Sequence, residues 1–122
     1  MNKTILQRLI SINSTNLPGN EMDMVKIILE YFPKNIKHQV IDHGNNRASL
    51  MIEIPGENKK SIAFIGHIDT VPVADEDAWE YPPFEGRIVD KYIYGRGASD
   101  MKGGVTAMIM TALHLIEEGI VP

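Results

Sequence analysis

The sequence predicts an α/β domain in which helices pack in layers against strands of mixed direction. Two observations support this prediction. Apolar residues recur at helical spacing near both ends of the chain, and between them lie short runs rich in β-branched and aromatic residues. A chain of 122 residues with 43% hydrophobic residues has the length of one domain, and we expect a single domain over residues 1–122.

Three segments have the pattern of amphipathic helices. Residues 4–12 place their apolar side chains on one face, which predicts a first helix. A second helix is expected to begin after Asn20, a favoured N-cap residue, and to end at Pro33. The last helix is predicted over residues 103–118, with Gly119 at its C-terminal cap.

The middle of the chain has the pattern of strands joined by turns. Strands are predicted at residues 37–42, 48–54, 62–65, 87–89 and 92–94. The strand at 62–65 is uniformly apolar and is therefore expected to be buried. Residues 74–86 form a long polar and aromatic segment, and an irregular loop of this length in a compact domain is usually functional.

Composition excludes several classes of partner and site. The net charge of −4 offers no basic excess for nucleic acid or an anionic membrane. With no cysteine there is neither a disulfide nor a thiolate metal site, so any metal must be held by nitrogen and oxygen. No stretch approaches the roughly 20 apolar residues of a membrane span. We expect a cytoplasmic protein that binds neither nucleic acid nor membrane.

His, Asp and Gly gather at the ends of two apolar runs. His67 and Asp69 follow the predicted strand at 62–65, and side chains two apart on a strand share a face. They are a metal ligand beside the carboxylate that orients it, or a histidine paired with an acid for structural reasons. Asp100 follows a glycine-rich turn and precedes the last helix, where a helix cap or first-turn acid is the alternative.

The glycine-rich stretch at 94–104 could also indicate a phosphate loop. A P-loop requires Gly-Lys followed by Ser or Thr, whereas Lys102 is followed by Gly103 and Gly104, so nucleotide binding is disfavoured. The glycines are better explained by a sharp turn of the backbone that brings Asp100 back towards His67.

Taken together, these motifs resemble one family. The segments GHIDTVP at 66–72 and YGRGASDMKGG at 94–104, with LPGNE at 17–21, are similar to those of the M20 metallopeptidases. That family includes aminoacylases, acetylornithine deacetylases and succinyl-diaminopimelate desuccinylases. The resemblance implies part of a mixed-sheet, three-layer catalytic domain of the zinc-peptidase type, without the lid domain.

The resemblance also implies roles for single residues. His67 corresponds to a ligand of one metal ion, and Asp100 to the carboxylate that bridges two ions, usually Zn²⁺ with Co²⁺ or Mn²⁺ as alternatives. Asp69 corresponds to the catalytic-site residue that hydrogen-bonds the histidine without binding metal. The peptide bond from Asp100 to Met101 is cis in members of the family.

What the chain lacks is equally specific. Members of the family carry a Glu-Glu pair, whose first glutamate is the general base, and further ligands later in their sequences. Glu117 and Glu118 do not replace it, because a straight helix from Gly103 would place Glu117 roughly 20 Å from Asp100. We therefore expect an N-terminal portion with two ligands of about five.

By resemblance, the complete enzyme would cleave the amide bond of N-acyl amino acids or small peptides with a metal-activated water, and would be a homodimer. A non-catalytic binding or regulatory domain is the alternative. The remaining histidines have no motif around them and are predicted to be structural or on the surface; they are His38, His43 and His114.

Overall fold

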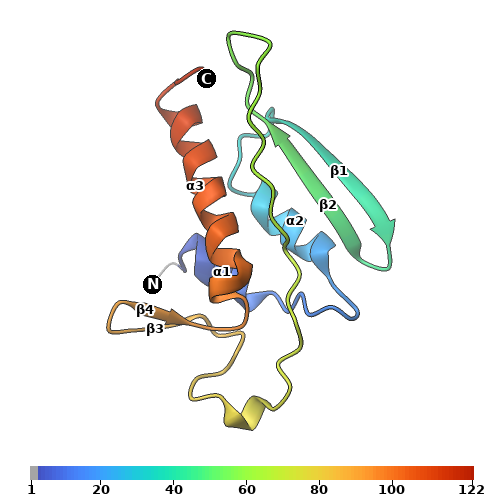
Figure 1. Cartoon of the computed structure of the whole chain (residues 1–122), viewed down its shortest axis with the longest axis vertical. Helices are drawn as coiled ribbons and strands as arrows, with labels where there is room; N and C mark the ends of the chain where they lie inside the picture. Colours follow the sequence, from blue (N-terminus) through green and yellow to red (C-terminus); the bar gives the residue numbers. More distant parts are fainter. Residues whose placement is uncertain (1–2) are drawn as a thin grey trace.

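The computed structural model describes residues 3–122 and contains three helices and two β-hairpins within that range (Figure 1). In chain order the elements are α1 (Ile5–Ser11), α2 (Glu21–Leu29), β1 (Lys37–Gly44), β2 (Arg47–Glu53), the short 3-10 turn η1 (Glu76–Ala78), β3 (Arg87–Val89), β4 (Tyr92–Tyr94), the irregular turn η2 (Ala98–Lys102) and α3 (Gly103–Glu117). Helices and strands therefore alternate in groups, as predicted.

The two N-terminal helices begin where the sequence indicates. Thr4 forms a capping box with Gln7, which satisfies free N–H groups at the start of α1. Asn20 is the residue before α2, but it adopts a left-handed conformation (φ 73°) and makes no side-chain cap. Its amide instead donates to the Asn13 carbonyl oxygen at 3.0 Å. The predicted position is confirmed, and the predicted capping bond is absent.

The core lies where the three helices meet beneath β2. Its buried members are apolar side chains from all three helices and from the turn after α2: Leu9, Met24, Ile28, Phe32, Val105 and Ile109. Apolar side chains on one face of β2 cover this cluster, among them Leu50 and Ile52. Removal of this apolar surface from water is the main term that holds the helices together.

The hairpin β1–β2 is antiparallel and pairs Lys37 with Glu53 at its open end. Its turn residues Asn45 and Asn46 both have positive φ, 52° and 62°, which is the geometry that matches the twist of paired strands. The second hairpin, β3–β4, is also antiparallel, and Asp90 and Lys91 both adopt positive φ at its turn.

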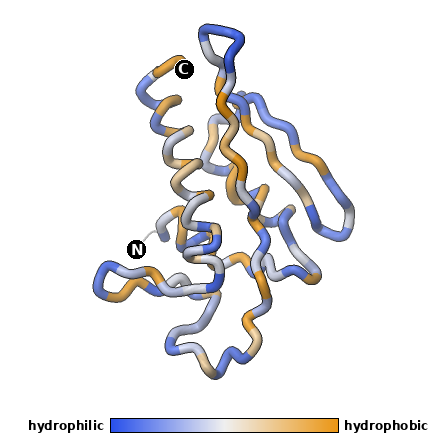
Figure 2. The backbone as a smooth tube through the Cα atoms, viewed as in Figure 1, coloured by the Kyte–Doolittle hydropathy of each residue, from blue (hydrophilic) through white to orange (hydrophobic). Residues whose placement is uncertain are grey.

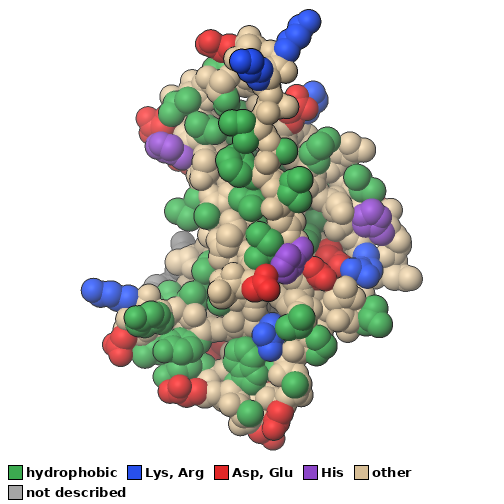
Figure 3. Space-filling view, in the orientation of Figure 1, with side chains coloured by type: hydrophobic (Ala, Val, Ile, Leu, Met, Phe, Trp, Pro, Cys, Tyr) green, Lys and Arg blue, Asp and Glu red, His purple; other side chains and the backbone are tan. Residues whose placement is uncertain are grey.

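The predicted buried strand at residues 62–65 is wrong. These residues have no strand partner among the described residues, and Ile62, Phe64 and Ile65 are 85%, 72% and 86% exposed. The segment runs alone between α3 and the β1–β2 hairpin (Figure 1), and its tube is coloured hydrophobic in Figure 2. Hydrophobic side chains lie along this face of the molecule (Figure 3). An apolar run becomes a buried strand only when neighbouring strands satisfy its backbone and layers cover both faces.

The fold class is confirmed as a mixture of helices and strands that corresponds to part of a catalytic domain. Its strands form two separate two-stranded sheets within residues 3–122. In the same range, no helix is long and apolar enough to cross a membrane.

Candidate metal centre

A short parallel contact holds the histidine-bearing segment in place. Thr15 and Thr70 form an isolated parallel bridge, in which the Asn16 N–H donates to the Thr70 carbonyl oxygen at 2.9 Å and the Thr70 N–H donates to Ser14 at 3.0 Å. The buried Ser14 hydroxyl also donates to the Ile68 carbonyl oxygen at 2.8 Å. The loop after α1 therefore anchors the end of an otherwise exposed segment.

The candidate centre comprises His67 and Asp69 on this segment and Asp100 on the turn that precedes α3. Gly97 has φ 80°, a conformation that favours glycine, and its carbonyl oxygen accepts the Lys102 N–H at 2.9 Å. Between them the peptide bond from Asp100 to Met101 is cis, as the resemblance implies. The turn directs the chain back so that Asp100 faces the end of the 61–69 segment.

The structure brings the three predicted site residues together. His67 Nε2 lies 2.9 Å from Asp100 Oδ1. On the other side of the ring, His67 Nδ1 lies 3.0 Å from the backbone oxygen of Asp69 and 3.3 Å from its Oδ1. One ring nitrogen therefore has two acceptors on Asp69, while the other faces the carboxylate of Asp100.

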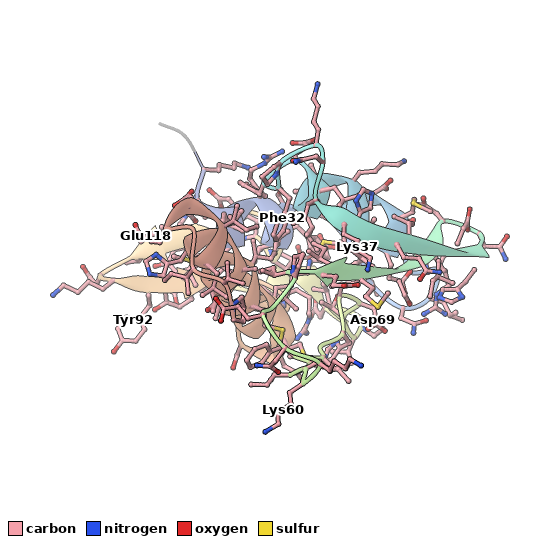
Figure 4. All side chains as sticks on the ribbon, turned by 90° about the horizontal axis from the view of Figure 1, so that it is seen from above. Phe32, Lys37, Lys60, Asp69, Tyr92 and Glu118 are labelled. Carbon is pink, nitrogen blue, oxygen red and sulfur yellow. The ribbon has the colours of Figure 1, made fainter. Side chains whose placement is uncertain are left out.

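Asn16 extends this chain of contacts by one residue. Its Nδ2 donates to Asp69 Oδ2 at 3.0 Å, so each carboxylate oxygen of Asp69 faces a different partner. Figure 4 labels Asp69 and Glu118 on opposite sides of α3, and Glu118 is the C-cap residue of that helix. Glu117 and Glu118 are thus outside the centre, as predicted from the length of the helix.

The pKa of His67 is raised above its usual value, first by the hydrogen bond to Asp100 and then by the hydrogen bond to the backbone of Asp69. Burial acts in the opposite direction. The side chains of His67, Asp69 and Asp100 are 48%, 29% and 87% exposed. The Asp100 carboxylate is therefore open to solvent and to any incoming ion.

The hollow around this centre contains two features that sequence patterns did not indicate. Asn16 and Arg96 both line it. The Arg96 guanidinium lies 5.0 Å from the centre of the Trp79 ring and donates to the Pro72 carbonyl oxygen at 3.2 Å. These contacts tie the long 74–86 segment to the turn that carries Asp100. Cation and aromatic residues were visible in the sequence, but their pairing across 17 positions was not.

Lys102 is a third residue whose place the sequence did not indicate. The sequence motif raises only the question of a phosphate-loop lysine, yet the Lys102 side chain is fully buried. Its Nζ donates to the carbonyl oxygens of Leu9 and Ile12 at 2.8 and 2.7 Å. Burial lowers the pKa of Lys102 to about 8. The two carbonyl oxygens favour the protonated form and counter part of that effect.

The other histidines lie away from the centre. His38 Nδ1 faces the Ile36 carbonyl oxygen at 2.9 Å, and His43 Nε2 faces the Ser49 hydroxyl at 3.0 Å. His114 is exposed on α3. All three are on the surface, as predicted.

The residues present fit a metal ion in their chemistry and nearly in their spacing. Two donors bound to a tetrahedral Zn²⁺ at 2.0–2.1 Å would be roughly 3.3 Å apart, and His67 Nε2 and Asp100 Oδ1 are 2.9 Å apart. A few tenths of an ångström of opening would admit the ion. Across residues 3–122, however, no group of three or more His, Cys, Asp or Glu is placed to hold one. Within the described residues, the centre thus brings together two potential metal donors, His67 and Asp100.

A solved structure with a similar fold identifies the class of the fold. An M20 family metallo-carboxypeptidase from Sulfolobus solfataricus superimposes with a TM-score of 0.78 at 24% identity, over 93% of this chain and 26% of that one. The fold is therefore that of part of a metallopeptidase catalytic domain.

The sequence comparisons give the family. Residues 63–122, which contain both motifs, match the model of peptidase family M20/M25/M40. Probable succinyl-diaminopimelate desuccinylases from two Staphylococcus aureus strains, MRSA252 and Mu50, are each 33% identical over 97% of this chain. The chain belongs to the M20 family of peptidases and amidohydrolases. It spans 28% and 29% of the length of those two relatives.

Proposed function

We propose that this chain supplies part of the site of a two-metal hydrolase, with His67 and Asp100 as metal ligands and Asp69 as the residue that orients His67. The observation that carries the proposal is the approach of His67 Nε2 to Asp100 Oδ1 at 2.9 Å across 33 positions of sequence. Zn²⁺ suits an imidazole and a carboxylate, as do Co²⁺ and Mn²⁺.

Each residue contributes through a specific atom. The two acceptors on Asp69 hold a proton on His67 Nδ1, which leaves the lone pair of Nε2 for a metal. Asp100 has one oxygen towards His67 and an exposed carboxylate, so it has the freedom to bridge two ions. When bound, a pair of divalent ions lowers the pKa of water and polarises a carbonyl group.

The proposed substrate class is supported by the family and by the names of similar proteins. The relatives are named as probable desuccinylases and the structural neighbour as a carboxypeptidase, and both names denote cleavage of an amide bond. We propose that the complete site hydrolyses the amide bond of N-acyl amino acids or small peptides. The general base and the other ligands are not among the residues of this chain that lie near His67.

A non-catalytic binding or regulatory role is the second candidate. The observation that favours it is the small donor set, because residues 3–122 contain no group of three or more His, Cys, Asp or Glu that could hold a metal ion. In that case the chain would retain the fold and bind metal or a partner without turning over a substrate.

The test is a titration of the purified chain with Zn²⁺ against a chromophoric chelator, in parallel with His67→Asn and Asp100→Asn. We expect weak binding that both substitutions reduce at least tenfold, with circular dichroism unchanged. Equal binding by all three proteins would refute the assignment of the ligands. We also expect the chain alone to leave N-succinyl and N-acetyl amino acids intact, and zinc-dependent turnover would show that the missing glutamates are not needed.

A further inference from the structure

Lys102 is buried, and among residues 3–122 it has no carboxylate partner. Its side chain has no exposed surface, and its Nζ is held by the carbonyl oxygens of Leu9 and Ile12 at 2.8 and 2.7 Å. Lysine is among the residues least often fully buried, because removing its charged amine from water costs free energy unless protein groups replace the lost hydrogen bonds. A buried lysine that makes two such bonds connects segments 90 and more positions apart.

The two carbonyl groups belong to the C-terminal end of α1 (Ile5–Ser11) and to its cap residue, Ile12. Carbonyl groups at that end of a helix lack partners within the helix and carry partial negative charge. A protonated amine is therefore favoured there by both hydrogen bonding and charge. The contact fixes the start of α3 to the first helix of the chain.

The stem of Lys102 passes directly beneath the turn that leads to Asp100. A β-carbon built on Gly97 would lie 3.2 and 3.4 Å from Cδ and Cε of Lys102, and 2.7 Å from Thr70 Cγ2. The Lys102 N–H also donates to the Gly97 carbonyl oxygen at 2.9 Å. Both the backbone and the side chain of Lys102 thus constrain the ends of the five-residue turn η2 (Ala98–Lys102).

Asp100 has little of its own to hold it. Its side chain is 87% exposed, and among the described residues its hydrogen-bond partner is His67. The carboxylate is therefore placed by the backbone of its turn. Two neighbours in that turn tie it to the rest of the fold: Lys102 through its bonds to α1, and Met101, which packs against the core and whose Sδ accepts the His67 N–H at 3.3 Å.

We propose that Lys102 is a positioning residue that sets the place of Asp100 by anchoring the turn η2 to the carbonyl groups of α1. This inference rests on the proposed function in one respect, the assignment of Asp100 as a metal ligand. Lys102 itself contacts neither metal nor substrate. Loss of the Lys102 amine would move the Asp100 carboxylate relative to His67. Metal affinity would then fall by more than the lower stability of the fold alone would cause.

The experiment compares Lys102→Met with Ile28→Ala, using Zn²⁺ affinity and urea unfolding. The methionine has a similar length but no donor, and Ile28 is a buried core residue that lines no part of the hollow. Ile28→Ala thus controls for lost stability. We expect Lys102→Met to raise the Kd for Zn²⁺ at least tenfold, while Ile28→Ala leaves it within twofold.

Lys102→Arg and Lys102→Gln complete the series. Lys102→Arg keeps the donors and the charge and should recover part of the affinity. If Lys102→Met does not fold, Lys102→Gln, which keeps an N–H donor on a shorter stem, takes its place with a smaller expected loss. Unchanged affinity in the folded variant, or an equal loss in Ile28→Ala, would overturn the inference.

The Asp100→Asn variant separates the two proposals. If Asp100→Asn loses affinity and the Lys102 variants do not, the metal assignment stands and the positioning role falls. If Asp100→Asn binds Zn²⁺ as well as the parent chain, Asp100 is not a ligand and the proposed function itself fails.

Discussion

Replacement of Asp69 by asparagine tests how the centre holds its histidine. In the parent chain Asp69 Oδ2 accepts from Asn16 at 3.0 Å, while Oδ1 lies 3.3 Å from His67 Nδ1. An asparagine amide has only one oxygen, so it can satisfy Asn16 or His67 but not both. Whichever way the amide turns, two donors face each other at one of these contacts.

The size of the loss in Zn²⁺ affinity depends on which hydrogen-bond acceptors of His67 remain in Asp69→Asn. The backbone oxygen of Asp69, 3.0 Å from His67 Nδ1, is retained, so the ring keeps an acceptor for its Nδ1 proton. The loss of a residue that orients a metal-bound histidine usually costs 10–100-fold in affinity. Because one acceptor remains, we expect the lower end, about tenfold or roughly 1.4 kcal/mol.

The assay is Zn²⁺ competition with a chromophoric chelator at constant pH and salt. Asp42→Asn is the matched control, because it removes the same charge from the exposed hairpin β1–β2. We expect the parent chain and Asp42→Asn to bind Zn²⁺ equally well, Asp69→Asn to bind it more weakly, and His67→Asn to bind it most weakly. A loss in Asp69→Asn as large as in His67→Asn, or no loss at all, would refute this account of the histidine.

Three further predictions concern protons and the core. Because the raised pKa of His67 lets protons compete with metal, Zn²⁺ affinity should fall as pH drops through that pKa, whereas Asp42→Asn should follow the parent curve. Without metal, the raised pKa of His67 contributes stability at pH values below the pKa that His67 has in the unfolded chain. This contribution is lost as the pH rises through the pKa of His67 in the folded chain, and urea unfolding of His67→Asn should lack this trend. Met24→Ala, at a fully buried position, should cost about 2–5 kcal/mol in urea unfolding, and an exposed Met51→Ala should cost far less.

Local patterns predicted the helices and the strands of both hairpins because short-range rules decide them. The apolar spacing of α3, the capping box at Thr4 and the asparagines in the first hairpin turn all act within a few residues. The approach of His67 to Asp100 was also predictable, through two motifs that resemble those of a known family and the glycine turn between them. Their chemical roles are still proposals.

The environment of each segment depended on what packs beside it. Residues 62–65 have the composition of a buried strand, yet composition cannot specify which other strands and helices will cover them, and here Ile62 and Ile65 are exposed. The contact of Asn16 with Asp69 spans 53 positions and no pattern indicates it. Such pairings are decided by the path of the whole backbone.

The sequence by itself determined the fold class, the positions of the helices and hairpins, and the identity of His67, Asp69 and Asp100 as the candidate centre. Only the tertiary structure decided that Lys102 is buried against the end of α1 and that Asn16 completes the contacts of Asp69. The physical reason is range: helix periodicity and turn chemistry act between near neighbours. The burial of an amine or a carboxylate instead depends on which distant backbone atoms are brought within hydrogen-bonding distance.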